Sequence, residues 1–329
     1  MNEQQIAKEL LGKTGEEMVA IEAMGESGSA RRYYRLLTVE GKSRVMCVSD
    51  NIKENDTFIS LSRYLRGRGL RVSEILAVTE DRRAYLLQDL GNRDLLWHLK
   101  NDEGRGKDAL IENAIEELAK FQELPEEEWR DIVEYEPFNE DLIKHDFNYA
   151  KENFFCIVGV KYDEKRLDRE LEQLEKRLMD YPREGWGLMY RDYQSRNIMI
   201  KEEKAWLIDF QSSRFGPGIY DLVSFAWQAK AGFSREEREE IAQKYVKARD
   251  PKGTTGLTGI VKREIDYWAM FRIIQTLGAY GLRGLKEGKR HFIESIPGAL
   301  GNLAELMERH GGEYPELTKT VAGAISEFS

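Results

Sequence analysis

Apolar residues recur along this chain with two different spacings, and the change from one to the other falls near residue 90. Before that point, short runs rich in β-branched and aromatic residues alternate with glycine and charged residues, which is typical of strands joined by tight turns. We therefore expect a small antiparallel sheet in the first 90 residues. The runs that predict its strands are residues 18–24, 31–39, 44–48, 72–78 and 84–87.

Helical spacing accompanies these strands and then takes over. Residues 1–12 place Ile6, Leu10 and Leu11 on one face of an amphipathic helix. A second helix is expected to begin at Asn55 or Asp56, either of which can cap its first turn. From residue 94 onward the chain is expected to be mostly α-helical. The main helices predicted there cover residues 109–124, 165–179, 222–230, 236–247, 261–285 and 300–308.

One strand pair interrupts the helical part, within the sequence YRDYQSRNIMIKEEKAWLIDF of residues 190–210. Two apolar runs flank a charged turn at residues 201–204, which predicts a hairpin. Asn197 stands just before the outgoing strand and Asp209 just after the returning one, so the two residues are expected to lie side by side. Together they offer two hard oxygen ligands to one cavity.

The composition limits the size of the core and the kind of partner. The chain has 329 residues, of which 41% are apolar, so two lobes are expected. Its net charge is −9 and no run of Lys and Arg is longer than a pair, which favours a small-molecule substrate over nucleic acid or an anionic membrane. Cys47 and Cys156 both stand in apolar sequence, which suits buried thiols in a reducing cytosol. No run approaches the 18 apolar residues of a membrane span, so we expect a cytoplasmic protein. The sequence does not determine its oligomeric state.

Asp192 precedes Asn197 by five residues, which is the D-x-x-x-x-N spacing of a kinase catalytic loop. In such loops the aspartate receives a hydroxyl proton, while the asparagine and a later aspartate hold Mg²⁺ on the nucleotide phosphates. Asp and Asn are also ordinary turn residues, and each alone carries little weight. Their order on a predicted hairpin nevertheless indicates a phosphotransferase, with Asp192 as base and Asn197 and Asp209 as metal ligands.

Two further segments are candidates for binding a nucleotide such as ATP. The first is the turn GESGS, whose backbone N–H groups can approach phosphates closely because it contains glycine. An ordinary hairpin turn explains this segment equally well on its own. The second is the connection at residues 88–91, where backbone groups of Gln88 and Leu90 are candidates for the adenine edge, although a simple connector would look the same. The candidate residues of the turn are Gly25, Ser27, Gly28 and Ser29.

A phosphate-binding lysine is missing from the third strand, where protein kinases carry one, because residues 45–48 read VMCV. Another cation is therefore expected to replace it. The strand after the glycine-rich turn carries Arg31, Arg32 and Arg35, of which Arg32 is favoured, while Arg196 lies within the catalytic loop. Arginine offers a bidentate fork to phosphate oxygens. The alternative is a surface ion pair, and at least one of these arginines is expected to form one.

Acidic residues elsewhere have simpler interpretations. Asp221, in the segment GPGIYDLVSF, is expected to cap the helix that follows it, and its carboxylate is also suited to brace the backbone of the catalytic loop. Four acids between residues 134 and 141 form either a solvated loop or a site for a cationic acceptor. They are Glu134, Glu136, Glu140 and Asp141.

On these residues the chain resembles the aminoglycoside phosphotransferase/choline kinase-like superfamily, over roughly residues 18–307. Within it the chain resembles the anomeric sugar kinases of cell-wall recycling, which phosphorylate N-acetylmuramate and N-acetylglucosamine on the C1 hydroxyl. Besides the catalytic loop, four segments carry the likeness. They are SARRYYRL at 29–36, LLQDLGNRDL at 86–95, LIDFQSSRFGPGIYDLVS at 207–224 and LGAYGLRGLKEGKRHFIESIP at 277–297.

The resemblance implies a protein-kinase-like bilobal α+β fold. Residues 1–90 would form a small antiparallel-sheet N-lobe that binds the nucleotide, and residues 91–329 a larger, mostly helical C-lobe with the catalytic hairpin and the substrate site. It also implies ATP and Mg²⁺ as cofactors.

The expected activity is transfer of the γ-phosphate to an amino-sugar hydroxyl. Only eleven residues separate Asp209 from Asp221, which leaves no room for a peptide platform, so the acceptor should be small. One alternative is a kinase of another small alcohol, such as an aminoglycoside, choline or homoserine. The other is a nucleotide-binding pseudokinase that acts as a scaffold.

Overall fold

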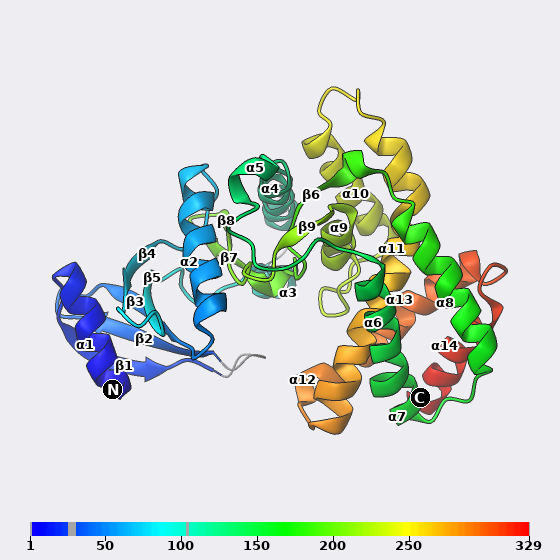
Figure 1. Ribbon diagram of the computed structural model, residues 1–329, viewed down its shortest axis with the longest axis horizontal. Helices are drawn as coiled ribbons and strands as arrows, with labels where there is room; N and C mark the ends of the chain where they lie inside the picture. Colours follow the sequence, from blue (N-terminus) through cyan, green and yellow to red (C-terminus); the bar gives the residue numbers. More distant parts are fainter. Residues whose placement is uncertain (1, 26–30, 103–104, 329) are drawn as a thin grey trace. The chain divides into compact units, whose positions relative to one another are not determined.

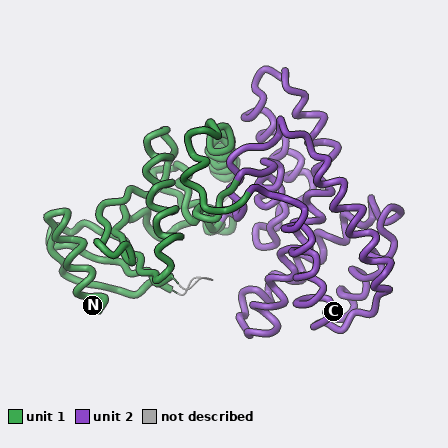
Figure 2. The backbone as a smooth tube through the Cα atoms, viewed as in Figure 1, with its two compact units in different colours: residues 1–136, 196–214 green, residues 137–195, 215–329 purple. Residues whose placement is uncertain are grey.

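The computed structural model describes residues 2–25, 31–102 and 105–328. The chain divides into two compact units, of which unit 1 comprises residues 1–136 and 196–214 and unit 2 comprises residues 137–195 and 215–329 (Figure 2). The short segment 196–214 of unit 1 contains the predicted hairpin. Packing thus groups this hairpin with the first part of the chain.

Unit 1 is built on a five-stranded antiparallel sheet with the order β1-β2-β3-β5-β4 (Figure 1). Its strands lie within or close to the predicted runs, which confirms the sheet. They are β1 (Met18–Ala23), β2 (Arg32–Thr38), β3 (Ser43–Val48), β4 (Ile75–Val78) and β5 (Ala84–Gln88).

The two faces of this sheet have different partners because side chains alternate along each strand. One face packs its apolar residues against α1 (Glu3–Thr14), where Leu10 and Leu11 are fully buried beside Leu36 and Met46. The other face carries Tyr85, whose ring stacks on that of Phe58 in α2 (Ile52–Gly67) with ring centroids 5.3 Å apart. α2 therefore covers the face opposite α1.

The predicted start of α2 was one turn too late. The side chain of Asn51, not that of Asn55 or Asp56, caps the helix by accepting a hydrogen bond from the backbone N–H of Glu54. Asn55 is buried inside the first turns and donates to the carbonyl oxygens of Ser49 and Arg82 instead. A buried asparagine with such partners stabilises the loops around the helix rather than its end.

The predicted hairpin is confirmed as β7 (Ile198–Lys201) and β8 (Lys204–Leu207), which pair in antiparallel register. Its turn residues Glu202 and Glu203 both have positive φ, as a tight two-residue hairpin turn requires. Asn113 accepts a hydrogen bond from the backbone N–H of Ala205 and so fixes β8 to a neighbouring helix. The helices that complete unit 1 are α3 (Leu95–Asn101), α4 (Arg105–Gln122) and α5 (Glu126–Trp129).

Unit 2 is mostly helical and is organised around α11 (Leu257–Tyr280), which packs against α6 (Glu140–Ala150), α9 (Ile219–Ala226) and α13 (Ile296–His310). The aromatic stripe of α11 lies in this core, since the rings of Trp268 and Phe271 contact that of Phe138. The other helices are α7 (Cys156–Val158), α8 (Glu164–Met179), α10 (Arg235–Arg249), α12 (Arg290–Ile293) and α14 (Pro315–Phe328), with π-helical turns at Lys151–Phe155 and Gly281–Lys286. A two-stranded sheet joins β6 (Trp186–Met189) to β9 (Arg214–Pro217).

Gly281 explains why two of these helical segments approach so closely. A Cβ atom at this position would lie only 1.8 Å from the carbonyl oxygen of Asn153, so only glycine fits between the two π-helical turns. The segment LGAYGLRG therefore has a packing role at this position.

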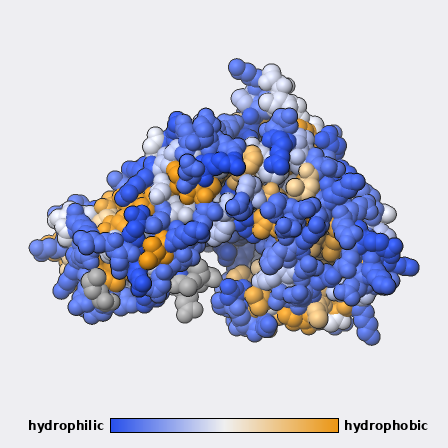
Figure 3. All heavy atoms as spheres, viewed as in Figure 1, coloured by the Kyte–Doolittle hydropathy of each residue, from blue (hydrophilic) through white to orange (hydrophobic). Residues whose placement is uncertain are grey.

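The surface of the protein is mainly polar. On the face shown in Figure 3, hydrophilic residues dominate and apolar residues are exposed in separate places. None of the described helices is both long and apolar enough to cross a membrane. The α+β class of the fold is as predicted. The functional division into lobes at residues 1–90 and 91–329 stays a prediction, because the two compact units follow packing alone.

Candidate active site

The two ends of the hairpin lie together in unit 1, as predicted. The backbone N–H of Ile208, beside Asp209, donates to the carbonyl oxygen of Asn197 at 3.1 Å. Asn197 is buried, whereas the side chain of Asp209 is 46% exposed. Asp209 also has a φ of 66°, a conformation that non-glycine residues rarely adopt and that clusters at functional sites.

This pair of residues fits a magnesium ion. Mg²⁺ takes oxygen ligands and usually binds one or two protein carboxylates, completing its octahedron with waters and substrate phosphates. Asp209 offers a carboxylate and Asn197 an amide oxygen, and a bound ion would neutralise charge on the phosphates. Within the described ranges no cluster of three or more His, Cys, Asp or Glu is arranged around a metal.

Asp209 is held by neighbours from distant parts of the sequence. Its Oδ1 accepts hydrogen bonds from Gln211 Nε2 at 2.8 Å and from Arg31 Nη1 at 3.3 Å. The next residue, Phe210, is fully buried and stacks on Phe58 of α2, with ring centroids 5.0 Å apart. The end of the hairpin is therefore anchored to α2 by a ring contact and to Arg31 by a charged one.

The arginine that sequence reasoning favoured lies elsewhere. Arg32 forms an ion pair of 2.7 Å with Glu3 of α1, and its side chain is 57% exposed. Arg35 pairs with Asp89 at 2.7 Å. The expectation that at least one arginine of this strand forms an ion pair is confirmed, and it is Arg31 that reaches Asp209. The sequence contained this signal, because alternation along an extended backbone turns the side chains of Arg31, just before β2, and Arg32, its first residue, in opposite directions.

Other predicted nucleotide-binding residues remain predictions. Arg196 is exposed and favours the ionised form of Asp94, whose pKa is nevertheless raised because the carboxyl is partly buried. Gln88 uses both of its backbone groups within unit 1, since its N–H donates to Glu74 and its carbonyl accepts from Ser73. Leu90 is buried, and Gly25 follows β1. Ser27, Gly28 and Ser29 lie outside the described residues.

The first part of the catalytic loop, up to Ser195, belongs to unit 2 and is braced by Asp221. This fully buried carboxylate accepts hydrogen bonds from the backbone N–H groups of Tyr190 and Arg191, each at 2.8 Å. Arg191 has a φ of 79°, so the residue before Asp192 is held in a strained conformation. The predicted N-cap role of Asp221 is wrong, because Gly218 occupies the N-cap of α9. The carboxylate of Asp221 binds the catalytic loop instead. The bracing role that its position also suggested is confirmed.

Asp192 contacts a buried arginine that sequence reasoning missed. Its Oδ1 accepts a hydrogen bond from Arg272 Nη2 at 2.9 Å. Arg272, on α11, also donates to Ser224 Oγ at 2.9 Å and to Gln275 Oε1. Burial alone would lower the pKa of Arg272, but the surrounding acidic groups outweigh it and raise the pKa, so the guanidinium is charged. A lone arginine in the apolar run YWAMFRII was the available signal, since a buried charge needs a partner.

A small pocket opens next to this pair within unit 2. Polar side chains without formal charge contribute much of its lining, and Arg272 supplies a cation. Among the described residues no Asp or Glu lines it. Gln228 is oriented here by accepting hydrogen bonds from the backbone N–H and the hydroxyl of Ser195. The polar lining residues are Gln194, Ser224, Gln228, Thr276 and Tyr280.

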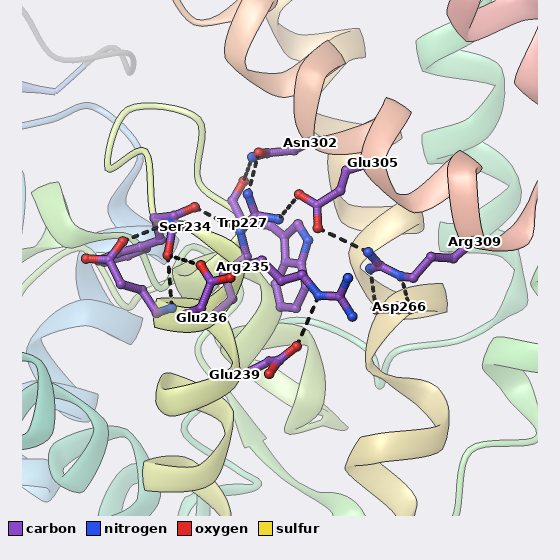
Figure 4. Close-up of polar contacts among 12 residues, drawn as sticks. Trp227, Ser234, Arg235, Glu236, Glu239, Asp266, Asn302, Glu305 and Arg309 are labelled. Atoms are coloured by element: carbon purple, nitrogen blue, oxygen red, sulfur yellow. Dashed lines mark hydrogen bonds and ion pairs between the residues drawn. The ribbon is translucent and has the colours of Figure 1, made fainter.

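A second arginine network connects to Trp227, one of the residues that line the pocket; Figure 4 shows its contacts among Asn302, Glu305, Arg309 and Asp266. Arg238 of α10 donates to Glu305 and Asn302 of α13, both at 2.9 Å, and Asn302 donates to the carbonyl oxygen of Trp227 at 3.1 Å. Arg309 extends the network from Glu305 to α11, where it pairs with Asp266. Trp227, which lines the pocket, is thereby tied to three helices.

Sequence comparison identifies the family. The sequence model of the phosphotransferase enzyme family (APH) matches residues 21–257, and the chain belongs to this family. It is a phosphotransferase with an alcohol group as acceptor. The N-acetylmuramate/N-acetylglucosamine kinase of Pseudomonas aeruginosa is 24% identical over 279 residues, which cover 82% of this chain and 78% of that relative. The N-acetylmuramate/N-acetylglucosamine kinase of Neisseria meningitidis is 24% identical over 304 residues, covering 87% and 85%.

Solved structures show the same fold. Ethanolamine kinase of Plasmodium vivax superposes with a TM-score of 0.63 at 15% identity, covering 90% of this chain and 85% of that one. The GDP complex of an aminoglycoside 2'-phosphotransferase also has a TM-score of 0.63, at 16% identity, and covers 93% and 99%. The predicted resemblance and the protein-kinase-like fold are therefore confirmed.

Proposed function

We propose that this enzyme transfers the γ-phosphate of ATP, with Mg²⁺, to a hydroxyl group of an amino sugar. The acceptor we propose is N-acetylmuramate or N-acetylglucosamine, and the site of transfer is the anomeric C1 hydroxyl. Relatives from two bacterial genera that are named N-acetylmuramate/N-acetylglucosamine kinase support this choice of sugar, since each aligns over more than three quarters of both chains. The proposal places the enzyme in the cytoplasm, where ATP is available.

The observation that carries the choice of acceptor is the likeness to kinases named for N-acetylmuramate and N-acetylglucosamine. The small, partly polar pocket that Arg272 lines in unit 2 is consistent with this choice. Amide and hydroxyl side chains are suited to the many hydroxyl groups of a sugar, because each can donate or accept a hydrogen bond. A cationic acceptor such as choline or an aminoglycoside would require carboxylates or an aromatic cage. The described lining of the pocket offers Arg272 as its charged group, which favours a neutral or anionic acceptor.

The acidic cluster between residues 134 and 141 was the reason to consider a cationic acceptor, and two of its members form ion pairs with lysines. Glu134 forms an ion pair of 2.6 Å with Lys53 in unit 1. Glu140, at the start of α6, lies 3.9 Å from Lys144 in unit 2. These contacts favour the solvated-loop interpretation of the cluster.

Each candidate residue has a defined task in the proposal. Asp192 orients the acceptor hydroxyl and receives its proton, and Arg272 fixes the Asp192 carboxylate. Asn197 and Asp209 hold Mg²⁺, which supplies charge stabilisation on the phosphates. Arg196 remains a candidate for contacting the transferred phosphate, and the turn at residues 25–29 and the connection at 88–91 remain candidates for binding ATP.

The anomeric hydroxyl suits a carboxylate base. The ring oxygen withdraws electrons from C1, so this hydroxyl is more acidic than an ordinary alcohol and needs less help to lose its proton. Orientation for in-line attack is then the main contribution of Asp192.

An acceptor panel tests the proposal. Release of ADP from ATP, or of GDP from GTP, is measured with Mg²⁺ in the presence of N-acetylmuramate, N-acetylglucosamine, kanamycin, choline and homoserine. Turnover with the amino sugars, at least about 100-fold above that with the cationic alcohols, is expected from the loss of matched contacts. Turnover of choline or kanamycin at the higher rate would overturn the choice of acceptor. Nucleotide binding without turnover of any acceptor would favour the scaffold.

A further inference from the structure

One face of the unit 1 sheet concentrates polar groups around a buried arginine. Tyr33, Cys47 and Tyr85 lie side by side across β2, β3 and β5 in the register of the sheet. Arg31 lies two residues before Tyr33, and its side chain is only 2% exposed. Its guanidinium carries a positive charge, because arginine stays protonated in proteins.

Two carboxylates hold this guanidinium. Arg31 Nη2 lies 2.6 Å from Glu54 of α2, and Arg31 Nη1 lies 3.3 Å from Asp209 at the end of the hairpin. α2 therefore fixes Arg31 through Glu54 and, one turn later, fixes Phe210 through Phe58. A single helix positions both the arginine and the residue next to the candidate metal ligand.

The arrangement matches the logic of a kinase, with one part exchanged. Protein kinases use a lysine on the third strand that pairs with a helix glutamate and contacts the phosphates. Here the third strand carries Cys47 on the face that α2 covers, and burial raises the pKa of its thiol, so it offers no charge there. The helix glutamate is nevertheless present as Glu54, and its partner is Arg31, which directly precedes the neighbouring strand β2.

We propose that Arg31 is the residue that binds the nucleotide phosphates in this enzyme, in place of a third-strand lysine, and that Glu54 positions it. The inference rests on the proposed function for its nucleotide, ATP. An arginine fork can keep one nitrogen on Glu54 and present others to phosphate oxygens, which a lysine cannot do. Its contact with Asp209 places this cation beside a candidate ligand of the phosphate-bound Mg²⁺.

The other cations of unit 1 that sequence reasoning considered have different surroundings. Arg32 pairs with Glu3 on the opposite face of the sheet, and Lys53 pairs with Glu134 with its side chain 75% exposed. Arg35 pairs with Asp89 and also donates to the carbonyl oxygen of Gly91. In the described part of unit 1, Arg31 is the basic residue that contacts Asp209.

Calorimetric titration of the whole protein tests the assignment without any turnover. The ligands are ATP and ADP with Mg²⁺, and adenosine, which retains the base and ribose but lacks phosphate. Arg31→Ala should weaken ATP and ADP binding by about 10- to 100-fold, the range for losing a charge-assisted hydrogen bond, and leave adenosine within about twofold. Arg32→Ala is the matched control, one residue away and exposed, and should leave all three affinities within about twofold.

Two further variants separate phosphate binding from a structural role. Arg31→Lys keeps the charge and should retain part of the ATP affinity. If Arg31→Ala shows no cooperative unfolding transition, and so is not folded, the ATP affinity of Arg31→Lys tests the phosphate contact in its place. Glu54→Gln should weaken ATP binding because Arg31 loses the carboxylate that pairs with it. Adding Glu54→Gln to Arg31→Ala should cause little further loss of ATP affinity.

Three results would overturn the inference. Wild-type ATP affinity in Arg31→Ala and Arg31→Lys would show that Arg31 does not bind phosphate. Equal losses for ATP and adenosine would show a structural role instead. Failure of the wild-type protein to bind ATP at all would overturn the proposed function itself, and this inference with it.

Discussion

At the scale of single residues, each carboxylate proposed for catalysis is held by an arginine from a distant part of the sequence. Asp192 contacts Arg272, which is 80 positions further along, and Asp209 contacts Arg31, which is 178 positions earlier. Both arginines are almost completely buried. Buried charges are costly unless paired, so each pair fixes the position of a partly exposed carboxylate.

Replacing Asp192 tests this arrangement at its proposed base. Asp192→Asn should lower kcat by roughly 10²- to 10⁴-fold, because a positioned base is lost, while ATP affinity stays unchanged. Arg272→Lys should cause a smaller loss of kcat with the KM for ATP unchanged, since lysine keeps the charge but lacks the fork that reaches Ser224 and Asp192. Steady-state kinetics and nucleotide titration give both quantities. An Asp192→Asn variant with the wild-type rate would show that the base is another group.

At the scale of elements, side chains from helices fix the conformation of nearby irregular backbone. α2 holds Arg31 and Phe210, and α9 holds the catalytic loop through Asp221. The held segments include residues with positive φ at Arg191 and Asp209, a conformation that costs energy and persists only where surrounding contacts enforce it. The rigid elements thus maintain the loop geometry on which the proposed chemistry depends.

The contacts that Asp221 of α9 makes with the catalytic loop lead to a prediction. Asp221→Ala removes the acceptor for two backbone N–H groups, so it should lower the free energy of unfolding by about 3 kcal/mol and lower kcat as the loop relaxes. Thermal unfolding and steady-state kinetics measure the two effects.

Asp250→Ala is the matched control, because Asp250 also accepts two backbone hydrogen bonds, from Thr254 and Thr255, but in another loop of unit 2. It should lose stability while keeping kcat near the wild-type value. Equal losses of kcat in both variants would mean that general destabilisation, and not the brace at the catalytic loop, causes the effect.

At the scale of the whole molecule, the sequence was informative where local rules decide and uninformative where distant contacts do. The sheet, the hairpin and the main helices could be predicted, because alternation, turn residues and helical spacing are local signals. The start of α2 was misjudged, since Asn51 and Asn55 are equally good caps by residue type. The N-cap role of Asp221 was misjudged as well.

The choice of Arg32 over Arg31 and the omission of Arg272 illustrate the same limit. Arg31 and Arg32 are chemically identical neighbours. Only the alternation of side chains along the backbone distinguishes Arg31, which reaches Asp209, from Arg32, which pairs with Glu3. Arg272 has its partner 80 residues away, so its contact with Asp192 required the fold of unit 2. The catalytic residues themselves could be proposed from sequence because their chemistry fixes a short spacing.

The most direct test of the central claim is phosphorus NMR of the product formed from N-acetylglucosamine with ATP and Mg²⁺, run beside the methyl glycoside of the same sugar. The account predicts a sugar 1-phosphate from the free sugar and no reaction of the methyl glycoside, because the glycoside has no C1 hydroxyl. Phosphorylation of the methyl glycoside at the rate of the free sugar would contradict transfer to C1, and the absence of any sugar phosphate would contradict the sugar kinase itself.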